Sequence, residues 1–125
     1  MFIYFDPNPV RRVAGDCVVR AICKAMRMTW DDAYWAICMH GYIEGDMPSS
    51  NSIWRTFLLN NGFKQKILPN MCPDCYTVKD FCNDHPYGVY ILFLNQHVVC
   101  VEDGDYFDTW NSGDEVPTFY FEREW

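Results

Sequence analysis

The sequence has 125 residues, 50% of them hydrophobic and 18% aromatic, which is long and apolar enough for one folded domain with a hydrophobic core. A formal net charge of −7, with no local cluster of Lys or Arg to offset it, argues against nucleic acid as a partner. No apolar run approaches the ~18 residues of a membrane span, and residues 1–9, MFIYFDPNP, lack the preceding positive charge of a signal peptide, so we expect no membrane partner.

Three helices are predicted in the first half of the chain. Asp16 is placed to cap the first, whose apolar face recurs at helical spacing: Val18, Ala21, Ile22 and Ala25. Thr29 and Asp32 have the spacing of a capping box at the start of the second, and its inward face is Trp30, Ala33, Tyr34 and Ile37. The third follows MPSSNS and stops at Gly62, with an apolar face of Ile53, Trp54, Phe57 and Leu58. Four aromatic residues of these helices are assigned to the core: Trp30, Tyr34, Trp35 and Trp54.

Strands predominate in the second half. Residues 64–68 form a short predicted strand, and Thr77 caps a fourth helix over residues 78–84. GVYILFLN, residues 88–95, is almost wholly apolar and predicts a buried strand.

The last third of the chain predicts a hairpin and a final strand. Residues 96–110 form two strands around Asp103-Gly104, a strong hairpin signal, and residues 116–122 alternate as a strand. Because helices come first and strands later, we predict a single α+β domain over residues 1–125, with N-terminal helices packed on a C-terminal antiparallel sheet.

Cys17 opens the first helix in the stretch VAGDCVVRAICKA, residues 13–25. Backbone N–H groups and the positive end of the helix dipole stabilise an anion in a first turn, so a thiol there has a lowered pKa and is reactive. Cys17 also lies off the apolar stripe of its helix, unlike a cysteine that serves only as a small core residue. Arg20, one turn later, either favours the thiolate or pairs with Asp16, and the sequence leaves both alternatives open.

The cysteines as a set indicate a reducing compartment. There are seven, an odd number, and they are not spaced as a disulfide framework. We therefore expect reduced thiols in a cytoplasmic protein.

A nucleophilic thiol needs a base, and the histidines are His40, His85 and His97. His40 lies near a helix end, where a histidine usually complements the helix dipole. His97 begins a strand directly after a buried strand, so we expect it to be held rigidly and assign it as the base.

The hairpin register selects the group that orients His97. A two-residue Asp103-Gly104 loop places Asp108 on the His97 face, diagonal to the imidazole. A three-residue loop places Asn111 opposite His97 and turns Asp108 away. The Asp-Gly dipeptide favours the shorter loop, so Asp108 is assigned and Asn111 is the reserve.

The motifs GDCVVRAI and HVVCVEDGDYFDTWNS, in this order and at this separation, resemble a small papain-like cysteine peptidase. The chain is similar to compact cysteine-peptidase-like proteins of bacteriophages and gut bacteria, and more distantly to the peptidase domains of bacteriocin-exporting transporters. The likeness extends from residue 7 to Trp110. It implies an α+β fold, attack of a thiolate on an amide, and a Cys, His, Asp or Asn order.

Carried over residue by residue, the resemblance gives Cys17 as nucleophile, His97 as base and Asp108 as orienting residue. Papain-like enzymes usually carry a Gln a few residues before the cysteine as oxyanion donor, and none is present here. The nearest amide side chain is Asn8, nine residues upstream, and we assign it the donor role.

A second set of residues has the spacing of zinc ligands: Cys72, Cys75, Cys82 and His85. Cys82 and His85 also fit the apolar face of the predicted fourth helix, together with Val78 and Phe81. We therefore expect core packing rather than a metal, and no cofactor.

The predicted function is a cysteine hydrolase that cleaves a peptide or isopeptide bond in a peptide or protein substrate through Cys17, His97, Asp108 and Asn8. Acyl transfer to an amine is an equivalent outcome, because an acyl-enzyme does not dictate its acceptor. The alternatives are an inactive papain-like protein that binds peptides and a zinc-stabilised interaction module.

Overall fold

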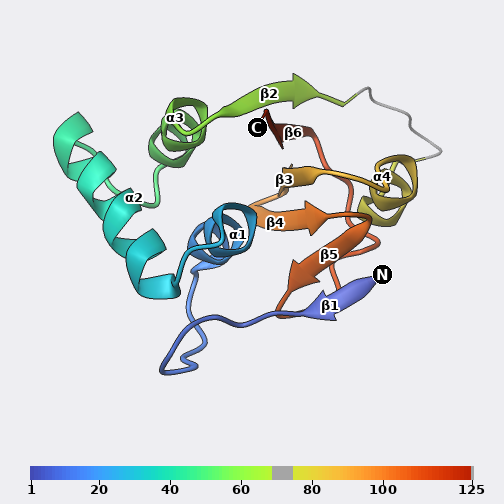
Figure 1. Ribbon diagram of the computed structural model, residues 1–125, viewed down its shortest axis with the longest axis horizontal. Helices are drawn as coiled ribbons and strands as arrows, with labels where there is room; N and C mark the ends of the chain where they lie inside the picture. Colours follow the sequence, from blue (N-terminus) through green and yellow to red (C-terminus); the bar gives the residue numbers. More distant parts are fainter. Residues whose placement is uncertain (69–74, 125) are drawn as a thin grey trace.

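The computed structural model describes residues 1–68 and 75–124, and the chain is α+β within these ranges. The helices are α1 (Cys17–Met26), α2 (Trp30–Glu44), α3 (Asn51–Asn60) and α4 (Val78–Asp84). The strands are β1 (Phe2–Tyr4), β2 (Phe63–Ile67), β3 (Val89–Leu94), β4 (His97–Glu102), β5 (Asp105–Asp108) and β6 (Phe119–Arg123). They form one sheet in the order β1-β5-β4-β3-β6-β2 (Figure 1). None of the described helices has the length and apolar character needed to cross a membrane.

The sheet is mixed, so the predicted antiparallel sheet is wrong at one edge. β1 runs parallel to β5, with Phe2 opposite Tyr106 and Tyr4 opposite Asp108. The other neighbours in the sheet pair antiparallel. Sequence reasoning missed β1 because three residues are too short to show a periodicity, and only pairing with β5 makes them a strand.

The helix starts are placed as predicted, but one of the predicted caps is wrong. Thr29 Oγ1 accepts a hydrogen bond from the Asp32 N–H at 3.1 Å, and Thr77 forms a full capping box with Asp80. Asp16 occupies the N-cap position of α1, yet its side chain makes no cap hydrogen bond. Its carboxylate instead pairs with the guanidinium of Arg20, which is charged and is therefore a stronger donor than a backbone N–H.

The β4–β5 hairpin has the predicted two-residue loop. Glu102 pairs with Asp105 and Val101 with Tyr106, and both loop residues, Asp103 and Gly104, have positive φ. This backbone is the type I′ turn that Asp-Gly favours. The register prediction is therefore confirmed.

The hydrophobic core lies on both faces of the sheet. Helices α1, α2 and α3 cover one face, where Ile22, Trp54 and Cys100 are in a single buried cluster. Helix α4 covers the other, where Phe81 belongs to a second cluster with Leu92 and other strand residues. The N-terminus of α1 is thereby held beside the start of β4, close to the end of β5 (Figure 1).

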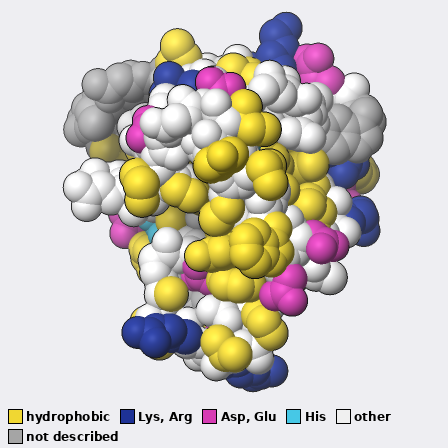
Figure 2. All heavy atoms as spheres, turned by 90° about the vertical axis from the view of Figure 1, so that its left-hand side faces the viewer, with side chains coloured by type: hydrophobic (Ala, Val, Ile, Leu, Met, Phe, Trp, Pro, Cys, Tyr) yellow, Lys and Arg dark blue, Asp and Glu magenta, His cyan; other side chains and the backbone are white. Residues whose placement is uncertain are grey.

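The aromatic residues assigned to the core divide between core and surface. Trp54 is buried and Trp30 is half-buried, but Tyr34 and Trp35 are 41% and 69% exposed, so their assignment to the core is wrong. Helix α2 is apolar on two opposite sides, and periodicity alone does not tell which side packs. The inward side is Ala33, Ile37 and Gly41. The outward residues Trp35, Met39, Tyr42 and Ile43 belong to a surface rich in hydrophobic side chains (Figure 2).

Candidate active site

Cys17, His97 and Asp108 come from three elements and meet beside the N-terminus of α1. Cys17 is the first residue of α1, His97 the first of β4 and Asp108 the last of β5. The His97 Nε2–H donates to Asp108 Oδ2 at 2.6 Å, and the Cys17 thiol is hydrogen-bonded to the His97 ring. Because Nε2 serves Asp108, Nδ1 is the ring nitrogen left for Cys17. A thiol, a base and an orienting carboxylate are thus arranged in sequence.

Asp108 is 1% exposed, and donors surround both of its carboxylate oxygens. Oδ2 accepts from His97 and from Ser112 Oγ at 2.8 Å. Oδ1 accepts from the Thr109 N–H at 2.8 Å and from Arg20 Nη2 at 3.2 Å. Burial alone would raise the pKa of Asp108, but the hydrogen bond and charge of His97, with Ser112 and Thr109, bring it below its ordinary value. The carboxylate is therefore ionised at neutral pH.

The surroundings of Cys17 and His97 favour an ion pair between them. Burial disfavours the thiolate, but the hydrogen bond from His97, the Val98 N–H and the positive charges of His97 and Arg20 outweigh it and lower the pKa of Cys17. Burial also disfavours the imidazolium, yet its hydrogen bonds to Asp108 and Cys17 raise the pKa of His97 to about 9. The lowered pKa of the thiol and the raised pKa of the imidazole both favour a thiolate–imidazolium pair.

Trp110 covers the imidazole. Its ring centroid lies 4.9 Å from that of His97 at an interplanar angle of 40°, and the indole is 44% exposed. It therefore stands between His97 and solvent, which strengthens the electrostatic interactions of the ring. The sequence did not predict this position of Trp110, because only the fold brings the indole over the start of β4.

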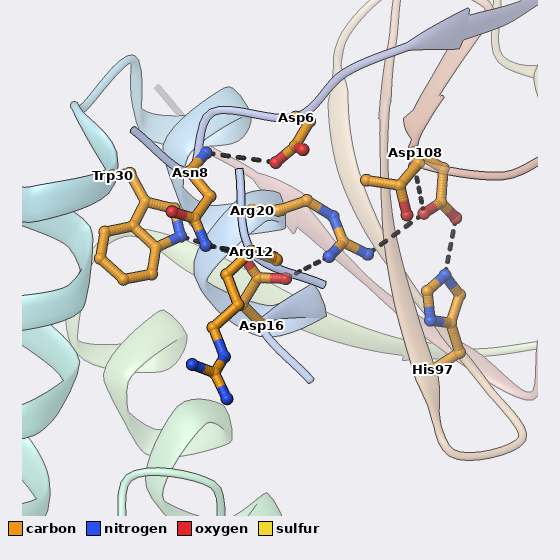
Figure 3. Close-up of polar contacts among 9 residues, drawn as sticks. Asp6, Asn8, Arg12, Asp16, Arg20, Trp30, His97 and Asp108 are labelled. Carbon is orange, nitrogen blue, oxygen red and sulfur yellow. Dashed lines mark hydrogen bonds and ion pairs between the residues drawn. The ribbon is translucent and has the colours of Figure 1, made fainter. Parts of the chain in front are cut away.

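A chain of polar contacts extends from Asp108 to the start of α2. Arg20 forms ion pairs with both Asp108 and Asp16, and the Trp30 Nε1–H donates to Asp16 Oδ2 at 3.0 Å. Figure 3 shows the guanidinium between the two carboxylates, with His97 on the far side of Asp108. The two alternatives for Arg20 are therefore both realised, because one guanidinium serves the Asp16 pair and adds positive charge near Cys17.

Asn8 is buried in the segment that precedes α1, and Asn8 and Cys17 line one cavity. Its Oδ1 accepts from the Val10 N–H at 3.1 Å, and its Nδ2 donates to the Arg12 carbonyl at 3.4 Å. These contacts hold the turn over residues 8–12. One amide hydrogen bond from Nδ2 is long, and the amide has a second N–H.

A cavity of about 700 Å³ opens beside Cys17 and His97. Most of its wall is apolar or aromatic, contributed by α1, α2, α3 and β3: Val18, Val19, Trp30, Tyr34, Ile37, Trp54 and Phe93. The segment around Ser49 and the β3–β4 turn at Gln96 form further parts of its edge. Its volume is that of a site for an organic ligand or several side chains.

The other candidate side chains have different partners. Asn111 Oδ1 accepts from the Tyr106 hydroxyl at 2.6 Å and from the Gly113 N–H at 3.0 Å. The ring of His40 is hydrogen-bonded to Thr56 at 2.7 Å.

The proposed zinc ligands fall partly outside the described residues, because Cys72 lies in the range 69–74. Cys82 is buried, which raises its pKa to about 11. His85 stacks on Phe81 with ring centroids 3.8 Å apart, and its Nδ1 lies 2.9 Å from the Phe81 carbonyl oxygen. In residues 1–68 and 75–124, no group of three or more His, Cys, Asp or Glu side chains is placed to hold a metal ion.

Comparisons of the chain with protein-family models, curated proteins and solved structures gave no match.

Proposed function

We propose that the protein is a papain-like cysteine hydrolase that cleaves peptide or isopeptide bonds beside bulky apolar residues. The observation that carries the proposal is the hydrogen-bonded series Cys17–His97–Asp108, with a lowered thiol pKa and a raised imidazole pKa at the edge of an apolar cavity. Perturbed ionisable groups beside a cavity are typical of catalytic sites.

The proposed reaction proceeds through an acyl-enzyme. The Cys17 thiolate attacks the amide carbonyl carbon, forming a C–S bond and an oxyanion. As the oxyanion collapses, the C–N bond breaks and the His97 imidazolium gives its proton to the leaving amine. Neutral His97 then takes a proton from water as the water oxygen attacks the thioester carbonyl carbon. Collapse of this second oxyanion breaks the C–S bond, which releases the carboxylic acid and restores the Cys17 thiolate beside the His97 imidazolium.

The oxyanion would be stabilised by donors beside Cys17. The start of α1 directs backbone N–H groups toward an anion at this position, and the amide of Asn8 is the proposed side-chain donor. Asp108 would keep the ring of His97 in the tautomer and orientation that serve Cys17.

The substrate class follows from the cavity. Its wall, mostly of aliphatic and aromatic residues, would remove large apolar side chains of a peptide from water. We therefore expect a preference for Phe, Leu, Met or Trp close to the cleaved bond.

The test is digestion of a mixed peptide library, with new termini identified by mass spectrometry. The wild-type protein should produce cleavage sites enriched in bulky apolar residues, and Cys17→Ala should produce none. A folded wild-type protein that leaves every peptide intact, or a Cys17→Ala variant that cleaves equally, would contradict the proposal.

A matched pair of variants tests the cavity. Ser49 is exposed at the cavity edge, so Ser49→Trp should obstruct the cavity and raise KM for apolar peptides by at least ~10-fold. Ser52→Trp, on the exposed side of α3 and outside the described lining, should leave KM unchanged. Equal KM values in the two variants would place the substrate elsewhere.

Peptide binding without cleavage is the second candidate, and the Asn8 contacts favour it. Both polar ends of that side chain already hold the 8–12 turn, so a weak oxyanion site is consistent with the geometry. In that case apolar peptides should bind the wild-type protein and Cys17→Ala with equal affinity and remain uncleaved by both.

A further inference from the structure

Arg20 is a buried cation between two carboxylates. Its side chain is 8% exposed, Nη1 pairs with Asp16 Oδ1, and Nη2 lies 3.2 Å from Asp108 Oδ1. Asp16 and Asp108 are themselves 10% and 1% exposed. Such a charge is costly to remove from water, so each partner depends on the others for compensation.

The contacts of Arg20 fix which way the Asp108 carboxylate turns. Arg20 and the Thr109 N–H hold Oδ1, while Oδ2 is left to His97 and Ser112. Rotation of the carboxylate would move Oδ2 away from the imidazole and break the contact with Arg20. The planar guanidinium reaches both carboxylates at once, which a lysine ammonium on a flexible stem does not do in a fixed geometry.

We propose that Arg20 is a positioning residue of the catalytic series: bridged to Asp16, it holds Oδ1 of Asp108 so that Oδ2 stays aligned with His97 and, through it, with Cys17. This inference rests on the function proposed above. Arg20 is buried behind the site and is not part of the described cavity lining, so it would act through the Asp108 carboxylate and through its charge rather than by touching substrate.

The other charged and titratable groups around Cys17 and His97 are few in the described part of the chain. The segment before α1 contributes Arg12 and Asp16. Helix α2 contributes Tyr34 and Cys38, and β5 contributes Asp108. Loss of Arg20 removes a positive charge from beside these groups and leaves the carboxylates of Asp16 and Asp108, which opposes formation of the thiolate. Loss of the positive charge and loss of the Asp108 alignment should therefore both slow the labelling of Cys17.

The test compares Arg20→Met with Arg20→Lys and with Arg27→Met. Arg27 ends the same helix, is 71% exposed and pairs with Glu102 at 2.8 Å, so it is a matched control away from the site. For each variant, circular dichroism checks the fold, iodoacetamide labelling of Cys17 is followed against pH, and kcat and KM are measured on a cleaved peptide.

Arg20→Met should need a pH about one unit higher for the same labelling rate, which is a ~10-fold slower rate on the acidic limb. Its kcat should fall while KM stays as in wild type, and Arg20→Lys should lie between the two. Arg27→Met should match wild type in every readout. A folded Arg20→Met with the wild-type pH profile and kcat would overturn the proposal.

If Arg20→Met does not fold, Arg20→Lys decides. This variant keeps the positive charge but loses the guanidinium that joins Asp16 to Asp108. A kcat and a pH profile of Cys17 labelling equal to those of wild type would therefore refute the positioning role of Arg20. Failure of the proposed function is distinct, because the folded wild-type protein would then cleave no peptide, while the labelling rates of Cys17 in wild type and in the Arg20 variants would still test the positioning role.

Discussion

Single residues set the charge state of the site, and His97 is the one on which the others depend. Its imidazolium is stabilised by Asp108 on one side and by Cys17 on the other, with Trp110 over the ring. The same proton lowers the pKa of the thiol, so the two titrations are coupled and belong to the pair. An imidazole without its carboxylate would lose both orientation and basicity.

Asp108→Ala should therefore reduce the rate of peptide cleavage by at least ~10²-fold, as expected for loss of an orienting group. Asn111→Ala is the control, because Asn111 bonds Tyr106 and Gly113 rather than His97. It should change the rate far less. The two rates are compared as kcat/KM on one peptide, and the opposite ranking would mean that Asn111 orients the base.

Among single residues, local patterns in the sequence were enough to predict the positions of Cys17 and Asp108. Cys17 is marked by a helix start, and Asp108 by the register of a short hairpin. Ser112, Trp110 and the double pairing of Arg20 were not predicted, because each contact joins segments that only the tertiary structure brings together.

Among the elements, the β4–β5 hairpin determines the distance between base and carboxylate. His97 starts one strand and Asp108 ends the other, so an added loop residue would move Asp108 to the opposite face. The loop backbone is fixed by positive φ at Asp103 and at Gly104, whose φ is +82°. A short turn thus controls the geometry at the far end of the strands.

Gly104→Ala should destabilise the protein by roughly 1–2 kcal/mol, because an L side chain is strained at this φ. The neighbours of the added Cβ lie at 3.5 Å or more, so the loss reports backbone strain rather than a clash. Gly15→Ala, whose Cβ meets nothing within 4 Å and whose φ is not positive, should stay within ~0.5 kcal/mol of wild type. Urea unfolding measures both, and equal losses would contradict the role of the turn.

At the scale of the whole molecule, the order of helices and strands in the sequence was enough to predict the α+β class, but it did not predict that the sheet is mixed. β1 extends the edge beside β5, and the Phe5 N–H donates to the Asp108 carbonyl at 2.9 Å. The first residues of the chain therefore brace the strand end that presents Asp108. Neither this parallel pairing nor the outward apolar side of α2 has a local signal in the sequence, since both depend on which surfaces pack.

The most direct test of the central claim, a Cys17–His97 ion pair, is the pH dependence of iodoacetamide labelling, resolved cysteine by cysteine with mass spectrometry. Labelling follows the thiolate, so the Cys17 rate should rise with pH through a midpoint below the ~8.5 of an ordinary cysteine, ahead of the other six thiols. His97→Ala should move the midpoint upward, because burial of the thiol persists while its hydrogen bond and positive charge are lost. A Cys17 midpoint at or above that of an ordinary cysteine, or one unchanged in His97→Ala, would contradict the ion pair.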